Sequence, residues 1–147
     1  MVAGGFALGE GMSKTGLAAA LVNTIPFDTW PALIVMIGGG LMCWLLSQFI
    51  SNSAATALMV PIMVAVGSGM GPSLGVYGGV GTLLIGVAMS ASFAMSLPIS
   101  TPPNAIAYST GLIKTSQMFR TGMVIGTISL ILGYVLIISI GKAGYFG

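Results

Sequence analysis

A proline-rich stretch inside a long apolar run constrains this chain most strongly. Residues 97–105 read Leu-Pro-Ile-Ser-Thr-Pro-Pro-Asn-Ala, so three of these nine residues are prolines. Proline lacks the backbone donor of a helix and pushes the residue before it out of the helical region, so a helix must break here. Within a membrane, broken backbone is tolerated only where it is buried in protein or lines a polar cavity. The stretch therefore predicts a functional site.

The residues after the break predict a second helix. Thr101 is a suitable N-cap and Pro102 suits the first helical position, so we expect a half-helix that runs through Ala105 to Gly111. Its positive end would point at the break, and the preceding helix, ending near residues 97–99, would present unpaired carbonyl oxygens. One gap would thus offer donors to an anion and acceptors to a small cation, as discontinuous helices do in secondary transporters.

The composition indicates an all-α, multi-pass integral membrane protein. Of 147 residues, 56% are hydrophobic and 4% are charged, whereas soluble domains carry about 25% charged residues. Residues 29–113 hold no charged side chain. The chain has no histidine, one cysteine and two acidic residues, so it cannot by itself assemble a metal cluster or a Ser-His-Asp or Cys-His catalytic site. We therefore expect no enzyme, and no basic cluster indicates nucleic-acid binding.

The first thirty residues predict a membrane-edge segment. Residues 1–9 are apolar but too short to cross about 30 Å of hydrocarbon, and are typical of the end of a truncated span. Residues 10–30 hold half of the charged residues and predict an interfacial segment, with a short helix around residues 13–21. Trp30 is typical of a membrane interface.

Residues 31–67 predict a re-entrant hairpin. Its first leg contains three glycines at 38–40, where another helix can approach closely. Ser-Asn-Ser at 51–53 predicts the turn, since these residues favour turns and caps. The second apolar leg, residues 54–66, is about 13 residues long and too short for an ordinary span, so the tip is expected at mid-membrane. The glycine-rich residues 67–81 predict an exposed loop.

Residues 82–113 predict the broken helix, and residues 121–141 predict the last full span. The positive-inside rule places the loop between Lys114 and Arg120 in the cytoplasm, so the C-terminal tail and the glycine-rich loop would lie on the outer side. Small residues recur at helical spacing along the last span and predict a packing stripe: Gly122, Gly126, Ser129 and Gly133.

Two helix N-termini follow from these assignments, one after residues 51–53 and one after Thr101. If the hairpin tip and the break face each other, both helix dipoles and several hydroxyl and amide groups converge on one point, which predicts an anion site without a formal positive charge. Taken singly, the first motif could be only a capped turn and the second only a gating kink.

Both motifs resemble signatures of the divalent-anion:sodium symporter family. Residues 51–61, which begin Ser-Asn-Ser-Ala-Ala-Thr, resemble its Ser-Asn-Thr hairpin signature, and residues 97–105 resemble its second signature. Residues 4–8 and 13–18 also resemble the segment that precedes the hairpin, so the resemblance covers nearly the whole chain. It implies a carrier of a di- or tricarboxylate or sulfate, with sodium as coupling ion and no other cofactor. It also implies an inverted-repeat fold, of which this chain matches the C-terminal repeat.

The resemblance implies the site residues as well. The substrate anion would be bound by Ser51, Asn52, Ser53, Thr101 and Pro102. Sodium would be held by carbonyl groups near Ile50 and Ser100 and by the side chain of Asn52, with Pro102 beside it. Ser53 stands where the family usually has threonine, and the lost methyl group bears on pocket size and specificity.

The same resemblance sets the expected partners and the alternatives. The complete carrier would need an N-terminal half with its own hairpin, would be a homodimer, and would lie among lipids in the plasma (inner) membrane. One alternative is a sodium-independent dicarboxylate exchanger of the same fold. Another is a truncated remnant without transport activity, because half of a binding site cannot alternate its access.

Overall fold

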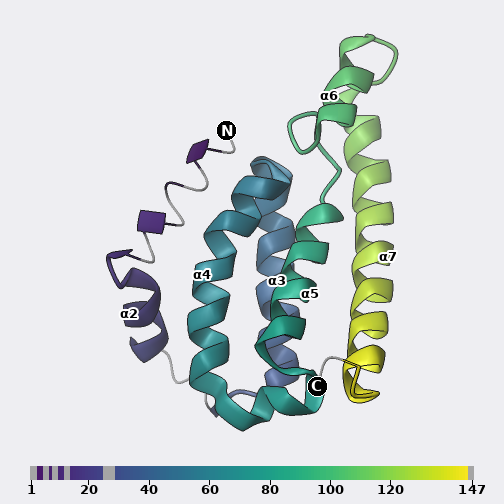
Figure 1. The fold of residues 1–147 in the computed structure, drawn as a ribbon. Coiled ribbons are helices and arrows are strands. Elements are labelled where there is room, and N and C mark those ends of the chain that lie inside the picture. The colour runs from purple at the N-terminus through teal and green to yellow at the C-terminus, as the bar shows by residue number, and fades with distance from the viewer. Residues whose placement is uncertain (1–2, 5–6, 8–9, 12–13, 25–28, 146–147) are drawn as a thin grey trace.

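A computed structural model describes residues 3–4, 7, 10–11, 14–24 and 29–145. These residues form helices and no strand, which confirms the all-α prediction for this part of the chain. The predicted span end at residues 1–9 lies largely outside the described residues. In chain order the elements are α2 (Leu17–Thr24), α3 (Ala32–Phe49), α4 (Asn52–Met70), the 3-10 helix η2 (Gly71–Tyr77), α5 (Gly79–Ser92), α6 (Pro102–Ser109) and α7 (Thr115–Lys142) (Figure 1).

Within the part of the chain that the structure describes, three segments are long and apolar enough to cross a membrane. They are α3, the continuous stretch of α4 and η2 (Asn52–Tyr77), and α7. The charge-free helix α5 is shorter, and α6 has eight residues with none buried. In Figure 1, α3, α4 and α5 pack side by side, α7 lies along the other side of α5, and α2 lies against α4. The hairpin tip, the break and α6 all lie toward the same end of this bundle.

Helix α3 packs against both α4 and α5. Its buried residues recur every three or four positions and so form one face, which packs chiefly against α5. The last two turns of this face are polar as well as buried. The buried residues of α3 are Ala32, Val35, Met36, Gly39, Gly40, Cys43, Trp44, Ser47 and Gln48.

A buried tyrosine joins three of the helices. Tyr134 of α7 donates a hydrogen bond from its Oη to the Met36 carbonyl of α3 at 2.9 Å and accepts one from Ser90 Oγ of α5 at 3.3 Å. A Cβ atom at Gly40 would collide with the Tyr134 hydroxyl, so the glycine makes room for it. The pairing satisfies a polar group that would otherwise be stranded among apolar side chains.

The small-residue stripe predicted for the last span is confirmed for its glycines. A Cβ at Gly122 would lie 2.5 Å from Ser96 Cα, and one at Gly126 would lie 2.7 Å from Phe93 O. Gly133 faces the ring of Phe93 in the same way. Helix α7 therefore lies in direct contact with the backbone of the break.

The second leg of the hairpin is longer than the sequence predicted. The prediction of about 13 residues, 54–66, is wrong because α4 has 19 residues and ends at Met70. The helix continues through Gly67, where the missing side chain allows close packing. A Cβ at this position would lie 3.1 Å from Val80 and 3.2 Å from Leu83. Tertiary packing here outweighs the low helix propensity of glycine. The short-leg argument for a re-entrant hairpin therefore fails, and that arrangement stays a prediction from the resemblance alone.

The glycine-rich segment is more ordered than an exposed loop. Residues 71–77 form η2, and the side chain of Leu74 within this element is buried. Lys142 Nζ lies 5.7 Å from the ring centroid of Tyr77, so this segment and the C-terminal end of α7 share one end of the bundle, as the charge pattern predicts. The α6–α7 connection lies at the opposite end (Figure 1).

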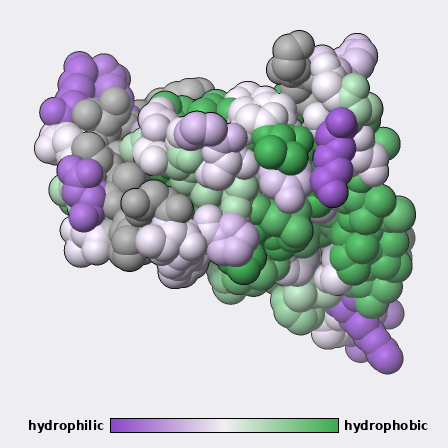
Figure 2. Space-filling model, turned by 90° about the horizontal axis from the view of Figure 1, so that it is seen from below, coloured by the Kyte–Doolittle hydropathy of each residue, from purple (hydrophilic) through white to green (hydrophobic). Residues whose placement is uncertain are grey.

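The outer face of α7 is apolar and exposed. In the view along the bundle in Figure 2, hydrophobic surface gathers on the side where α7 lies. Such a face suits hydrocarbon or another apolar helix rather than water. Its exposed large side chains are Val124, Ile125, Ile128, Ile131, Leu132, Val135 and Leu136.

Candidate functional site

The hairpin tip is a capped turn, as the sequence predicts, but α4 begins within it at Asn52 and not after residues 51–53. Ile50 is the extended C-cap of α3 and Ser51 is the N-cap of α4, with Ser51 Oγ accepting from Ala54 N at 3.3 Å. Asn52 takes the first helical position, and its Oδ1 accepts from Ser47 Oγ at 2.6 Å. The tip is thus a tight, capped turn whose asparagine side chain is held from the helix before it.

Helix α3 also contacts the chain where α5 ends. Ser47 Oγ shares its one proton between Asn52 Oδ1 and Ala91 O, which lies 3.1 Å away, and Trp44 Nε1 donates to Phe93 O at 3.3 Å. Ala91 O and Phe93 O are carbonyl groups at the end of α5, which have lost the next turn of helix as partner. Side chains of α3 therefore satisfy backbone groups that the break sets free.

Gln48 joins the hairpin tip to the break at two points. Its side-chain Oε1 accepts from Ser96 N at 3.2 Å, and its backbone carbonyl accepts from Ser100 Oγ at 3.1 Å. Gln48, Ser96 and Ser100 are all buried. Because Gln48 directly precedes the tip, these bonds hold the tip against the break.

The break starts earlier than the sequence predicts. The first half-helix was expected to reach residues 97–99, but α5 ends at Ser92 and residues 93–101 are irregular. Pro98 sets only the latest position at which the helix can end. The contacts from Trp44 and Gln48 replace the helical ladder before that point, which is why the end moves back to Ser92.

The second half-helix begins as predicted. Thr101 is the N-cap of α6, its Oγ1 accepts from Asn104 N at 3.4 Å, and Pro102 occupies the first position. Asn104 Nδ2 donates to Met95 O at 2.6 Å and to Leu97 O at 3.1 Å. One side chain of α6 therefore closes the break by pairing two of the carbonyl groups that the sequence left as free acceptors.

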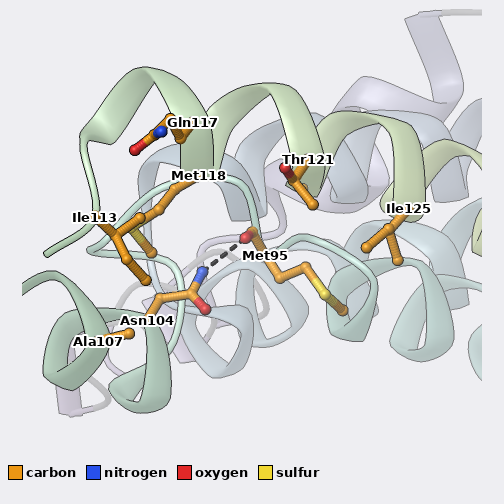
Figure 3. A pocket seen from close by; sticks show the side chains of 9 residues that line it. Met95, Asn104, Ala107, Ile113, Gln117, Met118, Thr121 and Ile125 are labelled. Atoms are coloured by element: carbon orange, nitrogen blue, oxygen red, sulfur yellow. Dashed lines mark hydrogen bonds between the residues drawn. The ribbon is translucent and has the colours of Figure 1, made fainter.

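A hollow of about 330 Å³ lies on the other side of the break, between α6 and α7 (Figure 3). Figure 3 shows Asn104 pointing toward Met95 on the floor of this hollow. The break thus has two different faces, one packed against α3 and one that contacts α7 at Gly122 and Gly126 and borders this hollow. The hollow is lined by Met95, Asn104, Ala107, Ile113, Gln117, Met118, Thr121, Gly122 and Ile125.

The structure brings the two predicted groups of site residues into one region through Gln48. Ser53 and Pro102 are exposed, and Ser51, Asn52 and Thr101 are half-buried, so a small ligand can reach them. Within the described residues, no direct hydrogen bond joins Asn52 or Ser53 to Thr101. The contacts that bring the two N-termini into one region are therefore those of Gln48, and not a direct hydrogen bond between the predicted residues.

The predicted sodium ligands keep free oxygen atoms. Among the residues that the structure describes, neither Ile50 O nor Ser100 O accepts a hydrogen bond. Asn52 Oδ1 accepts one bond and retains a second lone pair. Unwound backbone carbonyls of this kind coordinate sodium in transporters with discontinuous helices, so the residues present fit that ion. The described residues contain no group of histidine, cysteine, aspartate and glutamate side chains that could hold another metal ion.

Sequence reasoning missed the residues that hold the site together. Trp44, Ser47 and Gln48 recur at helical spacing near the end of α3, so they lie on one helix face, and the polar residues that end this apolar stripe were the available signal. Asn104 stood inside the recognised signature without a role. Its function becomes visible only when the chain turns back at the break and brings its side chain to Met95.

Comparison with known proteins adds the family. A family model described as "Sodium:sulfate symporter transmembrane region" matches residues 1–143. The chain is 31% identical over 131 residues to an uncharacterized transporter of Haemophilus influenzae, covering 87% of this chain and 27% of that protein. It is 30% identical over 135 residues to the Na(+)/dicarboxylate cotransporter 3 of Rattus norvegicus, covering 90% and 21%. It is 30% identical over 146 residues to the Na(+)/citrate cotransporter of Mus musculus, covering 97% and 24%.

The matches extend over most of this chain but only part of each relative. The chain spans between a fifth and about a quarter of the length of these three relatives. They are transporters, not enzymes, and together with the apolar helices they identify the chain as part of an integral, multi-pass membrane protein.

Proposed function

Because this chain belongs to the sodium:sulfate symporter family, we propose that it is the C-terminal repeat of a carrier that moves a divalent organic anion or sulfate together with sodium. One observation carries the proposal, namely the pair of hydrogen bonds by which Gln48 ties the hairpin tip to the break. An N-terminal half outside this sequence would supply the remainder of the site, and two copies of the complete carrier would form a homodimer.

The anion is bound by helix ends and neutral donors. Helix α4 begins at Asn52 and offers unpaired N–H groups and a partial positive charge. Helix α6 begins with Pro102 and Pro103, which have no N–H, so it contributes its partial positive charge alone. Since Asn52 Oδ1 is engaged by Ser47, its amide Nδ2 is the group that donates to the anion. Ser53 and Thr101 add hydroxyl groups. No charged residue lies between 29 and 113, so the anion is held without an ion pair and is released readily.

Sodium lies beside the anion on the acceptor side of the same junction. Ile50 O, Ser100 O and Asn52 Oδ1 supply oxygen ligands, and Pro102 lines the position. Asn52 thus contacts both ligands through the two ends of one amide. This shared residue accounts for coupling, because the orientation that suits sodium also presents Nδ2 to the anion.

The hairpin and the broken helix work as one unit in alternating access. The α3–α4 hairpin enters and leaves on one side of the membrane, and α5 with α6 forms one discontinuous span across it. Gly122 of α7 lies against the break, about 10 Å along the helix from its first residue, Thr115. The junction therefore lies about 10 Å from the N-terminal end of α7, measured along the helix axis.

Uptake measurements test the proposal. Membrane vesicles that contain the whole gene product are given labelled succinate, citrate or sulfate, with and without an inward sodium gradient. We expect sodium to stimulate the uptake of at least one of these anions at least tenfold. Equal uptake without sodium would favour the sodium-independent exchanger, and no uptake of any of them would contradict the proposed function.

Substitutions then test the site residues. Asn52→Ala and Thr101→Ala should abolish sodium-stimulated uptake while leaving the amount of protein in the membrane unchanged. Thr101→Ser, which keeps the hydroxyl and the helix cap, should restore most of it. Asn23→Ala on α2 and Thr127→Ala on the exposed side of α7 are the matched controls and should transport normally. Normal uptake by both site variants would refute the assignment.

A further inference from the structure

A buried polar pair at the junction has more hydrogen-bonding capacity than the chain uses. Gln48 is 3% exposed and Ser96 is 0% exposed, and the backbone N of Ser96 donates to Gln48 Oε1. That bond fixes the orientation of the amide, so Gln48 Nε2 is the free end. Among the described residues, neither Gln48 Nε2 nor Ser96 Oγ has a hydrogen-bond partner.

Unpaired polar groups of this kind are rare in native structures. Nearly all buried polar groups are paired, because a buried donor without an acceptor loses its hydration and gains nothing in return. Here two such groups lie on one pair of contacting residues, at the point where the hairpin tip meets the break. Thr82, a third buried residue with an unpaired hydroxyl, lies in the first turns of α5, well before the break.

The chemistry of the two groups defines what can satisfy them. An amide nitrogen donates and does not accept, so Gln48 Nε2 cannot be a ligand of sodium. The hydroxyl of Ser96 can also donate. Gln48 Nε2 therefore requires an acceptor that carries lone pairs, such as an oxygen of an anion or of a water molecule, and Ser96 can donate to the same oxygen.

We propose that Gln48 Nε2 and Ser96 Oγ donate to an oxygen atom that arrives when the carrier is loaded. The oxygen belongs either to the transported anion or to a water that is ordered beside the bound sodium. This inference rests on the proposed function and extends its site to two residues that the family signatures do not include. Gln48 then acts twice, since it positions the tip against the break and binds the ligand's oxygen.

Ser96→Ala gives the sharpest test because it removes only an unpaired hydroxyl. The whole gene product is purified in detergent, and its thermal unfolding is measured in choline chloride, in sodium chloride, and in sodium chloride with succinate, citrate or sulfate. Ligands that bind only the folded state raise Tm. We expect Ser96→Ala to have an unchanged or higher Tm in choline and to lose at least half of the rise that ligand causes in the unchanged protein.

The three conditions distinguish the two sources of the oxygen. If Ser96→Ala already loses the rise in Tm that sodium chloride causes relative to choline chloride, the oxygen belongs to a water beside the ion. If Ser96→Ala loses only the further rise in Tm that the anion causes in sodium chloride, the oxygen belongs to the anion. A full rise at both steps in Ser96→Ala would overturn the inference. If the unchanged protein shows no rise with any of the ligands, the proposed function itself fails.

Gln48→Glu is the second variant, with Gln117→Glu as its matched control. The glutamate at 48 keeps an oxygen for Ser96 N but replaces the donor by a negatively charged acceptor. We expect the anion concentration for half-maximal stabilisation to rise at least tenfold. Gln117 lies on the exposed start of α7, where its Oε1 accepts from Lys114 N, and a glutamate keeps that contact. An unchanged half-maximal concentration in Gln48→Glu would also overturn the inference.

Discussion

Asn104 illustrates how a single side chain can hold a broken helix in shape. Its Nδ2 group donates to two carbonyl oxygens on the other side of the break, and its backbone N is capped by Thr101. A buried or half-buried carbonyl that loses its donor at membrane depth has no water to replace it. The geometry of the two half-helices therefore depends on this amide more than on the prolines, which only prevent the helix from continuing.

Replacing Asn104 tests this dependence. Asn104→Ala should destabilise the folded protein by about 1–3 kcal/mol, because it strands Met95 O and Leu97 O. Asn104→Asp should cost more, since a carboxylate would face the same two carbonyl oxygens without a proton to donate. The measurement is denaturant or thermal unfolding of the purified protein, with Asn23→Ala on the exposed face of α2 as control. Wild-type stability of Asn104→Ala would show that the two bonds are dispensable.

At the scale of residues, the sequence predicted caps well and tertiary partners poorly. Thr101 was identified as a helix cap and residues 51–53 as a turn of cap-forming residues, because capping depends on neighbours within a few positions along the chain. Gln48 and Asn104 were missed because their partners lie on other elements or across the break. The roles of Asn52 and Ser53 in binding stay predictions that the uptake experiments address.

At the scale of elements, helix α7 positions the break through glycine contacts. Gly122 and Gly126 bring the helix against the backbone around Ser96 and Phe93, so the irregular segment is enclosed between α3 on one side and α7 on the other. Backbone atoms cannot move aside as a flexible side chain can. The spacing between α7 and the break is therefore fixed by the absence of side chains at these two positions.

A pair of alanine substitutions separates packing from helix propensity. Gly122→Ala should destabilise the protein by about 1–3 kcal/mol, because its Cβ would lie 2.5 Å from Ser96 Cα and 2.8 Å from Met95 O. Gly38→Ala in α3 has nothing within 4 Å of its Cβ and should stabilise by about 0.5–1 kcal/mol. Thermal unfolding of both variants gives the comparison. A stable Gly122→Ala would mean that α7 can shift away from the break.

The errors in element boundaries have one physical cause. The predicted leg at residues 54–66 and the predicted end of the first half-helix near residue 97 relied on local helix breakers. In the structure, α4 continues past Gly67 because α5 packs there, and α5 stops at Ser92 because α3 pairs its last carbonyls. The existence and the order of the helices could be predicted from hydropathy and from the prolines. The residues at which the helices end depend on contacts with other helices, which the sequence pattern does not show.

At the scale of the whole molecule, the chain concentrates neutral polar groups at one junction in an otherwise apolar bundle. Its charged residues lie at the ends of segments, the outer face of α7 is apolar, and residues 29–113 carry no charge. Membrane location and family could be predicted from this pattern and from two signatures. The hydrogen bonds that join the hairpin to the break could not be predicted, because the composition does not specify which helices contact each other.

The central claim is that hairpin tip and break form one ligand site, and cysteine protection tests it most directly. In the whole gene product with Cys43 replaced by serine, single cysteines are placed beside the binding residues, at Ala57 one turn after Ser53 and at Pro103 two residues after Thr101. The control is a cysteine at the exposed Ser109 of α6. Their reaction with a charged thiol reagent is followed in membranes as sodium and the transported anion are added together.

The account predicts that Ala57→Cys and Pro103→Cys become protected at the same half-saturating anion concentration and only when sodium is present, while Ser109→Cys reacts at an unchanged rate. Protection of one position without the other, or of either at clearly different concentrations, would contradict a shared site.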